Sequence, residues 1–111
     1  MRKAIIGCAL LMASLPTMAD ECKSWGCVST ISELYTNADG RIYIGTPLDE
    51  KLANCTPISD IYFTLNPSSG NAKEIYSSLL AAFMANRKIQ LRIKEGHAQC
   101  ELSYVRLNVD F

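Results

Sequence analysis

The cysteines of this chain form a pattern that is typical of a small disulfide-bonded domain. They occupy positions 8, 22, 27, 55 and 100. Cys8 lies in an apolar leader described below, and the other four are an even number in a short chain, which predicts two disulfides. Four cysteines allow three pairings. We favour Cys55 with Cys100, which would tie the middle of the chain to its last strand, and Cys22 with Cys27, which are close neighbours in sequence.

The first residues have the three parts of a secretory signal. An arginine and a lysine follow the initial methionine, an apolar stretch extends to Leu15, and small residues precede Asp20. The apolar run is too short for a membrane helix, which needs about 20 residues, and fits a cleaved leader. We therefore expect residues 1–19 to be a signal peptide, residues 20–111 to form a single domain without a membrane span, and the location to be secreted or periplasmic.

A lipoprotein signal is the alternative interpretation of the leader. Residues 5–8 resemble a cleavage box whose cysteine, here Cys8, would carry the lipid. Only one apolar residue separates Lys3 from this box, and the apolar run continues past Cys8. The later cleavage site therefore fits the length of a leader's apolar region better.

Alternating apolar residues and turn formers predict five strands. The clearest is 88–94, which places its isoleucines and its leucine on one face and polar residues on the other. Residues 100–111 predict a long last strand with a bulge near 103–105, where the alternation changes phase. The other predicted strands are a hairpin of 28–35 and 41–46 around an Asp-Gly turn, and a third strand at 58–65.

The segment after residue 70 predicts a helix. Asn71 and Glu74 have the spacing of a capping box, and Asn86, Arg87 and Lys88 suit the end of the helix. Apolar residues at three- and four-residue spacing form a stripe that we expect to face the core. The stripe consists of Ile75, Tyr76, Leu79, Leu80, Ala82 and Phe83.

The predicted order of elements is strand, strand, strand, helix, strand, strand, so the fold class is mostly β with one helix (β-β-β-α-β-β). A helix between the third and fourth of five strands is typical of a small OB-like Greek-key barrel, in which the helix closes one end. An α+β sandwich, with the helix on one face of a sheet, is the alternative.

Residues 74–82, then 88–93, then Cys100 give a helix-strand-cysteine order that resembles small exported bacterial OB-fold proteins. Among these are the binding (B) subunits of AB5 toxins of the subtilase-cytotoxin and pertussis-like kind. The likeness covers about the C-terminal half and concerns fold more than activity. It implies a barrel that assembles into a ring of identical subunits and binds host glycans near one rim. No sugar-binding signature carries over residue by residue.

The charge of the chain gives no indication of a nucleic-acid partner. The full chain has a formal net charge of +0, and loss of Arg2 and Lys3 with the leader makes it −2. Lys88, Arg92 and Lys94 form a short basic stripe on one strand face. A nearly balanced surface does not attract polyanions, so we expect this stripe to be solvated and no nucleic acid to bind.

Residues that could form a catalytic or metal site are few. His97 is the only histidine, and it lies in an expected turn where nothing is predicted to position it. The adjacent acids at 20–21 and 49–50 would point apart on an extended segment. The cysteine spacings contain no Cys-x-x-Cys pair. We therefore expect a non-enzymatic protein with no catalytic residues, no metal and no cofactor.

Aromatic and basic side chains are the candidate ligand contacts. Trp25, Tyr35 and Tyr43 lie near the start of the domain, and Arg92 and Tyr104 lie on the last two strands. Core packing or cross-strand pairing would explain the same aromatic residues. We predict an exported binding module for a glycan or a protein. The alternative is a periplasmic inhibitor or accessory protein of a larger enzyme, with the loop 47–57 entering the partner's cleft.

Overall fold

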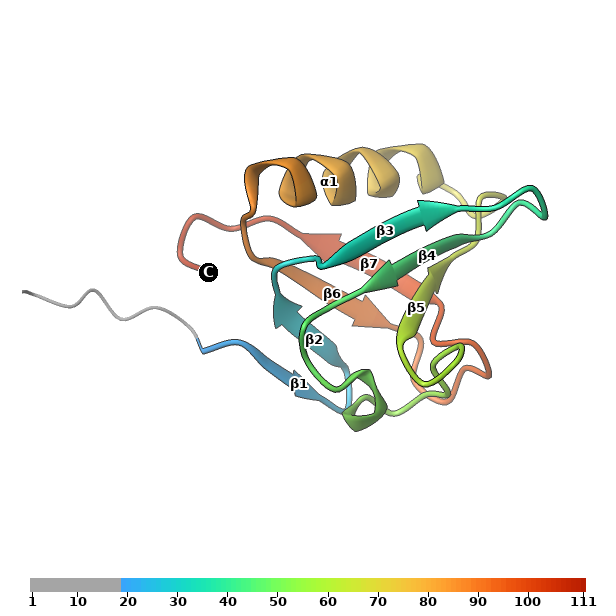
Figure 1. Ribbon diagram of the computed structural model, residues 1–111, viewed down its shortest axis with the longest axis horizontal. Helices are drawn as coiled ribbons and strands as arrows, with labels where there is room; N and C mark the ends of the chain where they lie inside the picture. Colours follow the sequence, from blue (N-terminus) through green and yellow to red (C-terminus); the bar gives the residue numbers. More distant parts are fainter. Residues whose placement is uncertain (1–18) are drawn as a thin grey trace, which may run out of the picture.

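A computed structural model of the chain describes residues 19–111 (Figure 1). The predicted leader, with Cys8, lies outside these residues except for Ala19. Within the described residues no helix is long and apolar enough to cross a membrane. The elements in chain order are β1 (Glu21–Lys23), β2 (Gly26–Ser29), β3 (Glu33–Thr36), β4 (Ile42–Gly45), a 3-10 turn η1 (Glu50–Leu52), β5 (Tyr62–Leu65), α1 (Ala72–Ala85), β6 (Ile89–Ile93) and β7 (Leu102–Arg106).

The strands form two antiparallel sheets, one with the order β1-β2-β6-β7 and one with the order β3-β4-β5. The fold is therefore mostly β with one helix, as predicted. The chain passes from β2 into β3 through residues 30–32. Elsewhere Thr64 and Glu101 form a single parallel bridge, and the Thr64 N–H donates to the Cys100 carbonyl at 3.1 Å. The connection at 30–32 and the contact of Thr64 with the segment 100–101 join the two sheets. They do not close the sheets into a continuous barrel.

The core lies between the two sheets and the helix. Ile44 and Phe63 from one sheet, Leu91 from the other and Leu79 from α1 are fully buried. The helix contacts β3 and β7, which are edge strands of different sheets, so it covers both (Figure 1). The inward half of the alternation predicted for β6 is confirmed, because Ile89, Leu91 and Ile93 are all buried, whereas Gln90 on the opposite face is buried too.

The helix has the predicted extent, but its predicted N-terminal cap is wrong. Asn71 has a left-handed backbone (φ 40°) and its side chain makes no capping hydrogen bond, because capping requires an extended backbone at that position. Asn86 ends the helix in a left-handed conformation, and its N–H bonds to carbonyls of the last turn. The predicted apolar stripe is only partly correct, since Leu80 and Phe83 are 41% and 37% exposed.

The predicted strand 28–35 is divided in the structure into β2 and β3 by a bend, and β1 was not predicted. The predicted last strand is too long, because β7 ends at Arg106 and residues 107–111 leave the sheet. The predicted bulge is confirmed. Arg92 pairs with Tyr104 and Ile93 with Leu102, so Ser103 is the extra residue on β7.

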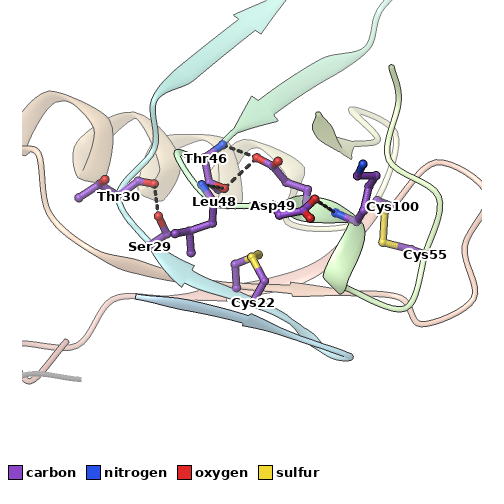
Figure 2. Close-up of a disulfide and its surroundings, with 11 residues drawn as sticks. Cys22, Ser29, Thr30, Thr46, Leu48, Asp49, Cys55 and Cys100 are labelled. Atoms are coloured by element: carbon purple, nitrogen blue, oxygen red, sulfur yellow. Dashed lines mark hydrogen bonds between the residues drawn. A yellow bond between two sulfur atoms is a disulfide. The ribbon is translucent and has the colours of Figure 1, made fainter. Parts of the chain in front are cut away.

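Both disulfides have the pairing that the sequence favours. Cys22 bonds to Cys27 across the β1–β2 ladder, where the two residues are direct partners. Cys55 bonds to Cys100 and so ties the loop after β4 to the segment before β7 (Figure 2). The second bond lies next to the bridge of Thr64 and Glu101. It therefore reinforces the place where the two sheets meet, and both bonds are compatible with an oxidising compartment.

Candidate functional site

Three tyrosines project from the outer face of the β3-β4-β5 sheet. In each strand, alternate side chains point inward to the core, and the residues between them point outward. The inward set is Leu34, Ile44 and Phe63, and the outward set is Tyr35, Tyr43 and Tyr62. We call the outward tyrosines, together with Glu33 and Asn37, the tyrosine face.

The rings of the tyrosine face contact one another. Tyr35 and Tyr43 are cross-strand partners and stack with their centroids 4.7 Å apart and their planes 14° from parallel. Tyr62 meets both rings edge-on, with its centroid 5.4 Å from that of Tyr35 and 5.8 Å from that of Tyr43. These are the two favoured geometries of aromatic pairs. They make a preformed platform, of which Tyr35 is 37% exposed.

Polar groups surround the rings. The Tyr62 hydroxyl donates to Glu33 Oε1 at 3.0 Å, and Asn37 Nδ2 donates to the Tyr43 hydroxyl at 3.4 Å. The hydrogen bond to Glu33 is the main cause that raises the pKa of Tyr62, and partial removal from water is the main cause that raises the pKa of Tyr35. Tyrosine hydroxyls are neutral near pH 7, so the Tyr35 hydroxyl can donate and accept hydrogen bonds, whereas the Tyr62 hydroxyl donates to Glu33 and can accept.

A polar cleft adjoins the tyrosine face. Thr64 is the cross-strand partner of Tyr43 and also lines a cleft of about 370 Å³ between the turn 39–41 and the segment 99–101. The Thr64 hydroxyl donates to the Gln99 carbonyl at 2.9 Å, and the Arg41 guanidinium donates to the Gln99 side chain. The cleft thus holds a half-buried cation, Arg41, and it meets the tyrosine face at Thr64, next to Tyr43.

The five predicted ligand residues lie on two different sheets. Tyr35 and Tyr43 belong to the tyrosine face, whereas Arg92 lies on the outer face of the β1-β2-β6-β7 sheet with its Cζ 5.8 Å from the centre of the Trp25 ring. Tyr104 is the cross-strand partner of Arg92 and is 40% exposed. The structure therefore brings Trp25, Arg92 and Tyr104 to one side of the molecule and separates them from the tyrosine pair.

Sequence reasoning missed Tyr62, which completes the tyrosine face. Tyr62 and Thr64 alternate with Phe63 and Leu65 within β5, and this alternation is visible in the sequence. It marks Tyr62 as an outward residue. What the sequence does not contain is the register that places Tyr62 diagonally next to Tyr43 rather than at another point of the sheet.

The expectation that nothing positions His97 is wrong. His97 Nδ1 accepts the N–H groups of Gln99 at 3.0 Å and of Glu101 at 3.4 Å, and Nε2 lies 3.2 Å from Glu101 Oε2. Both ring nitrogens thus hold the turn that carries Cys100. The ring acts here as a structural connector of the turn before β7.

The adjacent acids Asp49 and Glu50 also have structural partners. Asp49 accepts the N–H of Lys51, and the buried Glu50 carboxylate accepts the N–H and the hydroxyl of Thr46 at 2.7 and 2.8 Å. Figure 2 shows the two bonds from Thr46. Across residues 19–111, no three His, Cys, Asp or Glu side chains converge as ligands for a metal ion.

Comparisons of the chain with family models, with curated proteins and with solved structures give no match.

Proposed function

We propose that this chain is an exported, non-enzymatic binding module that recognises a glycan through the tyrosine face. The observation that carries the proposal is the contact of three tyrosine rings on an outer sheet surface, at centroid distances of 4.7 to 5.8 Å. Aromatic rings held by their neighbours lose little conformational entropy on binding and offer a large contact area.

The polar groups of the tyrosine face suit a sugar. The C–H face of a pyranose ring is apolar and packs on an aromatic ring, while its hydroxyls need both donors and acceptors. Tyr43 and Tyr62 supply hydroxyls, Glu33 supplies a carboxylate and Asn37 an amide, all within one cluster. The adjoining cleft adds the Arg41 guanidinium for a second sugar unit or a charged substituent.

An OB-like barrel is the fold that we propose for this domain, and two observations support it. If β2 and β3 are taken as one bent strand, five strands follow in the order of an OB-fold, with α1 between the third and the fourth. The bridge of Thr64 and Glu101 is parallel, as the closing contact of such a barrel would be. When β2 and β3 are counted as one strand, β4 and β5 are the second and third strands of the barrel. They carry Tyr43 and Tyr62, and OB-folds bind oligosaccharides on the surface formed by these two strands.

The resemblance to AB5-toxin binding subunits adds a role and an assembly to this proposal. A B-subunit-like module would be exported by its leader, oxidised outside the cytoplasm and assembled from several copies. The two disulfides are compatible with this location. Measurement of the mass of the oxidised, processed protein in solution tests the assembly, and a monomer at all concentrations would contradict it.

A glycan array with the oxidised, processed protein tests the function. We expect binding to a restricted set of glycans, and a loss of at least about tenfold in affinity for Tyr43→Ala, because that change removes the ring on the middle strand, which contacts both other rings. Met84→Ala, an exposed helix position, is the control and should bind normally. Binding of no glycan, or equal affinity of Tyr43→Ala and the unaltered protein, would overturn the proposal. Loss only in Tyr104→Ala would move the site to the other sheet.

A second candidate function, inhibition or support of a larger periplasmic enzyme, has one observation in its favour. Leu52 is 61% exposed at the end of η1, in a loop held by Glu50 and by the Cys55–Cys100 bond. A rigid loop with an apolar tip is suited to a partner's cleft. Capture of one periplasmic enzyme by the unaltered protein and by Tyr43→Ala, but not by Leu52→Asp, would favour this function over glycan binding.

A further inference from the structure

A groove lies on the outer face of the β1-β2-β6-β7 sheet, on the other sheet from the tyrosine face. It encloses about 460 Å³, and we call it the arginine groove. Its floor contains Val28 and Gln90, which are 2% and 8% exposed. Its walls are formed by two guanidinium groups and two aromatic rings from distant parts of the chain: Trp25, Arg92, Arg106 and Phe111.

The first wall of the arginine groove is fixed by the backbone. Trp25 follows β1, and its carbonyl accepts the N–H of Ile93 at 2.9 Å. Gly26 comes next with φ +140°, and a Cβ there would lie 1.9 Å from the Leu91 carbonyl oxygen, so only glycine fits. Gly26 is the cross-strand partner of Arg92, whose Cζ stands 5.8 Å from the centre of the Trp25 ring. The cation and the ring are thus positioned by the sheet itself.

The second wall is formed by the chain after β7. Residues 107–111 leave the sheet and turn back, so that Phe111 comes within 5.9 Å of Arg106 Cζ, measured to the ring centre. The end of the described chain lies beside the start of β6 in Figure 1. Arg106 Nη1 also donates to Gln90 Oε1 at 3.0 Å. This side therefore repeats the arrangement of the first, with a guanidinium beside an aromatic ring.

Basic side chains outnumber acidic side chains in the groove lining. Among residues 19–111 neither Arg92 nor Arg106 forms an ion pair. Asp110 is the one carboxylate side chain in the groove lining, against the two guanidinium groups. A guanidinium that lies by an aromatic ring keeps N–H donors in its own plane free, and these match the two oxygens of a carboxylate, phosphate or sulfate.

We propose that the arginine groove binds a small anion of one chemical class, an oxyanion attached to a flat ring. The oxyanion would contact Arg92 and Arg106, and the ring would pack between Trp25 and Phe111 above Val28. The volume of the groove suits a ligand of this size. This site is independent of the tyrosine face, so it stands whether or not that face binds a glycan.

Trp25 makes a direct test available, because it is the single tryptophan of the chain. Its fluorescence would be followed while the oxidised protein is titrated with phenyl phosphate, benzoate, inorganic phosphate and benzyl alcohol. We expect saturable changes with phenyl phosphate and benzoate, and affinities at least about tenfold weaker for the two probes that lack either the ring or the charge. No saturable change with either aryl anion, or equal affinity for inorganic phosphate and phenyl phosphate, would overturn the proposal.

Matched variants, measured by calorimetry so that changes near Trp25 do not affect the readout, complete the test. Arg92→Gln and Arg106→Gln should each weaken phenyl phosphate binding about tenfold, and Arg87→Gln, an exposed position between α1 and β6, should not weaken it. Asp110→Asn should strengthen binding severalfold, because it removes the carboxylate from the lining. An equal loss in Arg87→Gln and Arg92→Gln, or weaker binding in Asp110→Asn, would contradict a built anion site.

Discussion

The two sheets share one inward pattern and differ on their outer faces. On the inside both present buried aliphatic residues, such as Ile44 and Leu91. On the outside, the β3-β4-β5 sheet carries a cluster of tyrosines that contact one another, whereas the β1-β2-β6-β7 sheet carries arginines beside rings and is partly covered by the chain after β7. The inward-facing residues specify the fold. The outward-facing residues can differ in chemistry without changing the fold, so a binding site is expected among them.

The junction between the sheets should give the largest effect. Replacement of both Cys55 and Cys100 by alanine removes a bond that closes a span of 45 residues, and we expect unfolding free energy to fall by about 4 kcal/mol. The matching replacement of Cys22 and Cys27, which lie 5 residues apart in one sheet, should cost only about 2 kcal/mol. Urea unfolding of the two variants measures the two losses of unfolding free energy. Equal losses would show that the disulfide at the junction stabilises the fold no more than the disulfide within one sheet.

The loop between β4 and β5 is the next test, because η1 contacts β1 and β2 of the other sheet. Glu50→Ala leaves the Thr46 N–H and hydroxyl without their acceptor and should lower stability by about 2 kcal/mol. Glu50→Gln keeps an acceptor oxygen in the same place and should lose much less. Thermal unfolding of the pair checks this, and similar losses in both would mean that the charge rather than the hydrogen bonds matters.

Double-mutant cycles compare the outer faces directly. Tyr35→Ala and Tyr43→Ala should be coupled by about 1 kcal/mol, because the two rings stack. Trp25→Ala and Arg92→Gln should be coupled by about 0.5 kcal/mol, as expected for a cation near a ring at a partly exposed site. Unfolding free energies of the single and double variants give both values. Absence of coupling between Tyr35 and Tyr43 would mean that the platform is not preformed.

The smallest effect is the pH dependence of the tyrosine face. Because the pKa of Tyr62 and the pKa of Tyr35 are raised in the folded protein, their favourable contribution is present below their ordinary pKa of about 10 and is lost as pH rises through the raised values. Titration of tyrosinate absorbance should show these two groups ionising late. Glu33→Gln should move Tyr62 toward its ordinary pKa, and an unchanged curve in that variant would remove Glu33 as the cause.

Much of the fold could be predicted because its signals are local. The alternation in β6, the bulge at Ser103 and the turn between β3 and β4 are read from neighbouring residues. The failures are of two kinds. The predicted Asn71 cap is wrong because Asn71 has a left-handed backbone within the turn that the Ala72 N–H closes onto the Ser69 carbonyl. The predicted last strand is too long because 107–111 turn back toward β6 instead of continuing. Neither cause is visible within the segment concerned.

The sequence by itself indicated the class of fold and the inward residues of the strands, since both follow from periodicity along the chain, and it favoured the observed cysteine pairing among three possible ones. Only the tertiary structure decided that Tyr62 joins Tyr35 and Tyr43, and that Arg106 and Phe111 face Trp25 and Arg92. The physical reason is that strand register and the path of residues 107–111 depend on contacts between distant parts of the chain. Residues far apart in sequence become neighbours only when the ladders form, and a register shift of one residue would turn the strand side chains among them, such as Tyr62 and Arg106, to the opposite face.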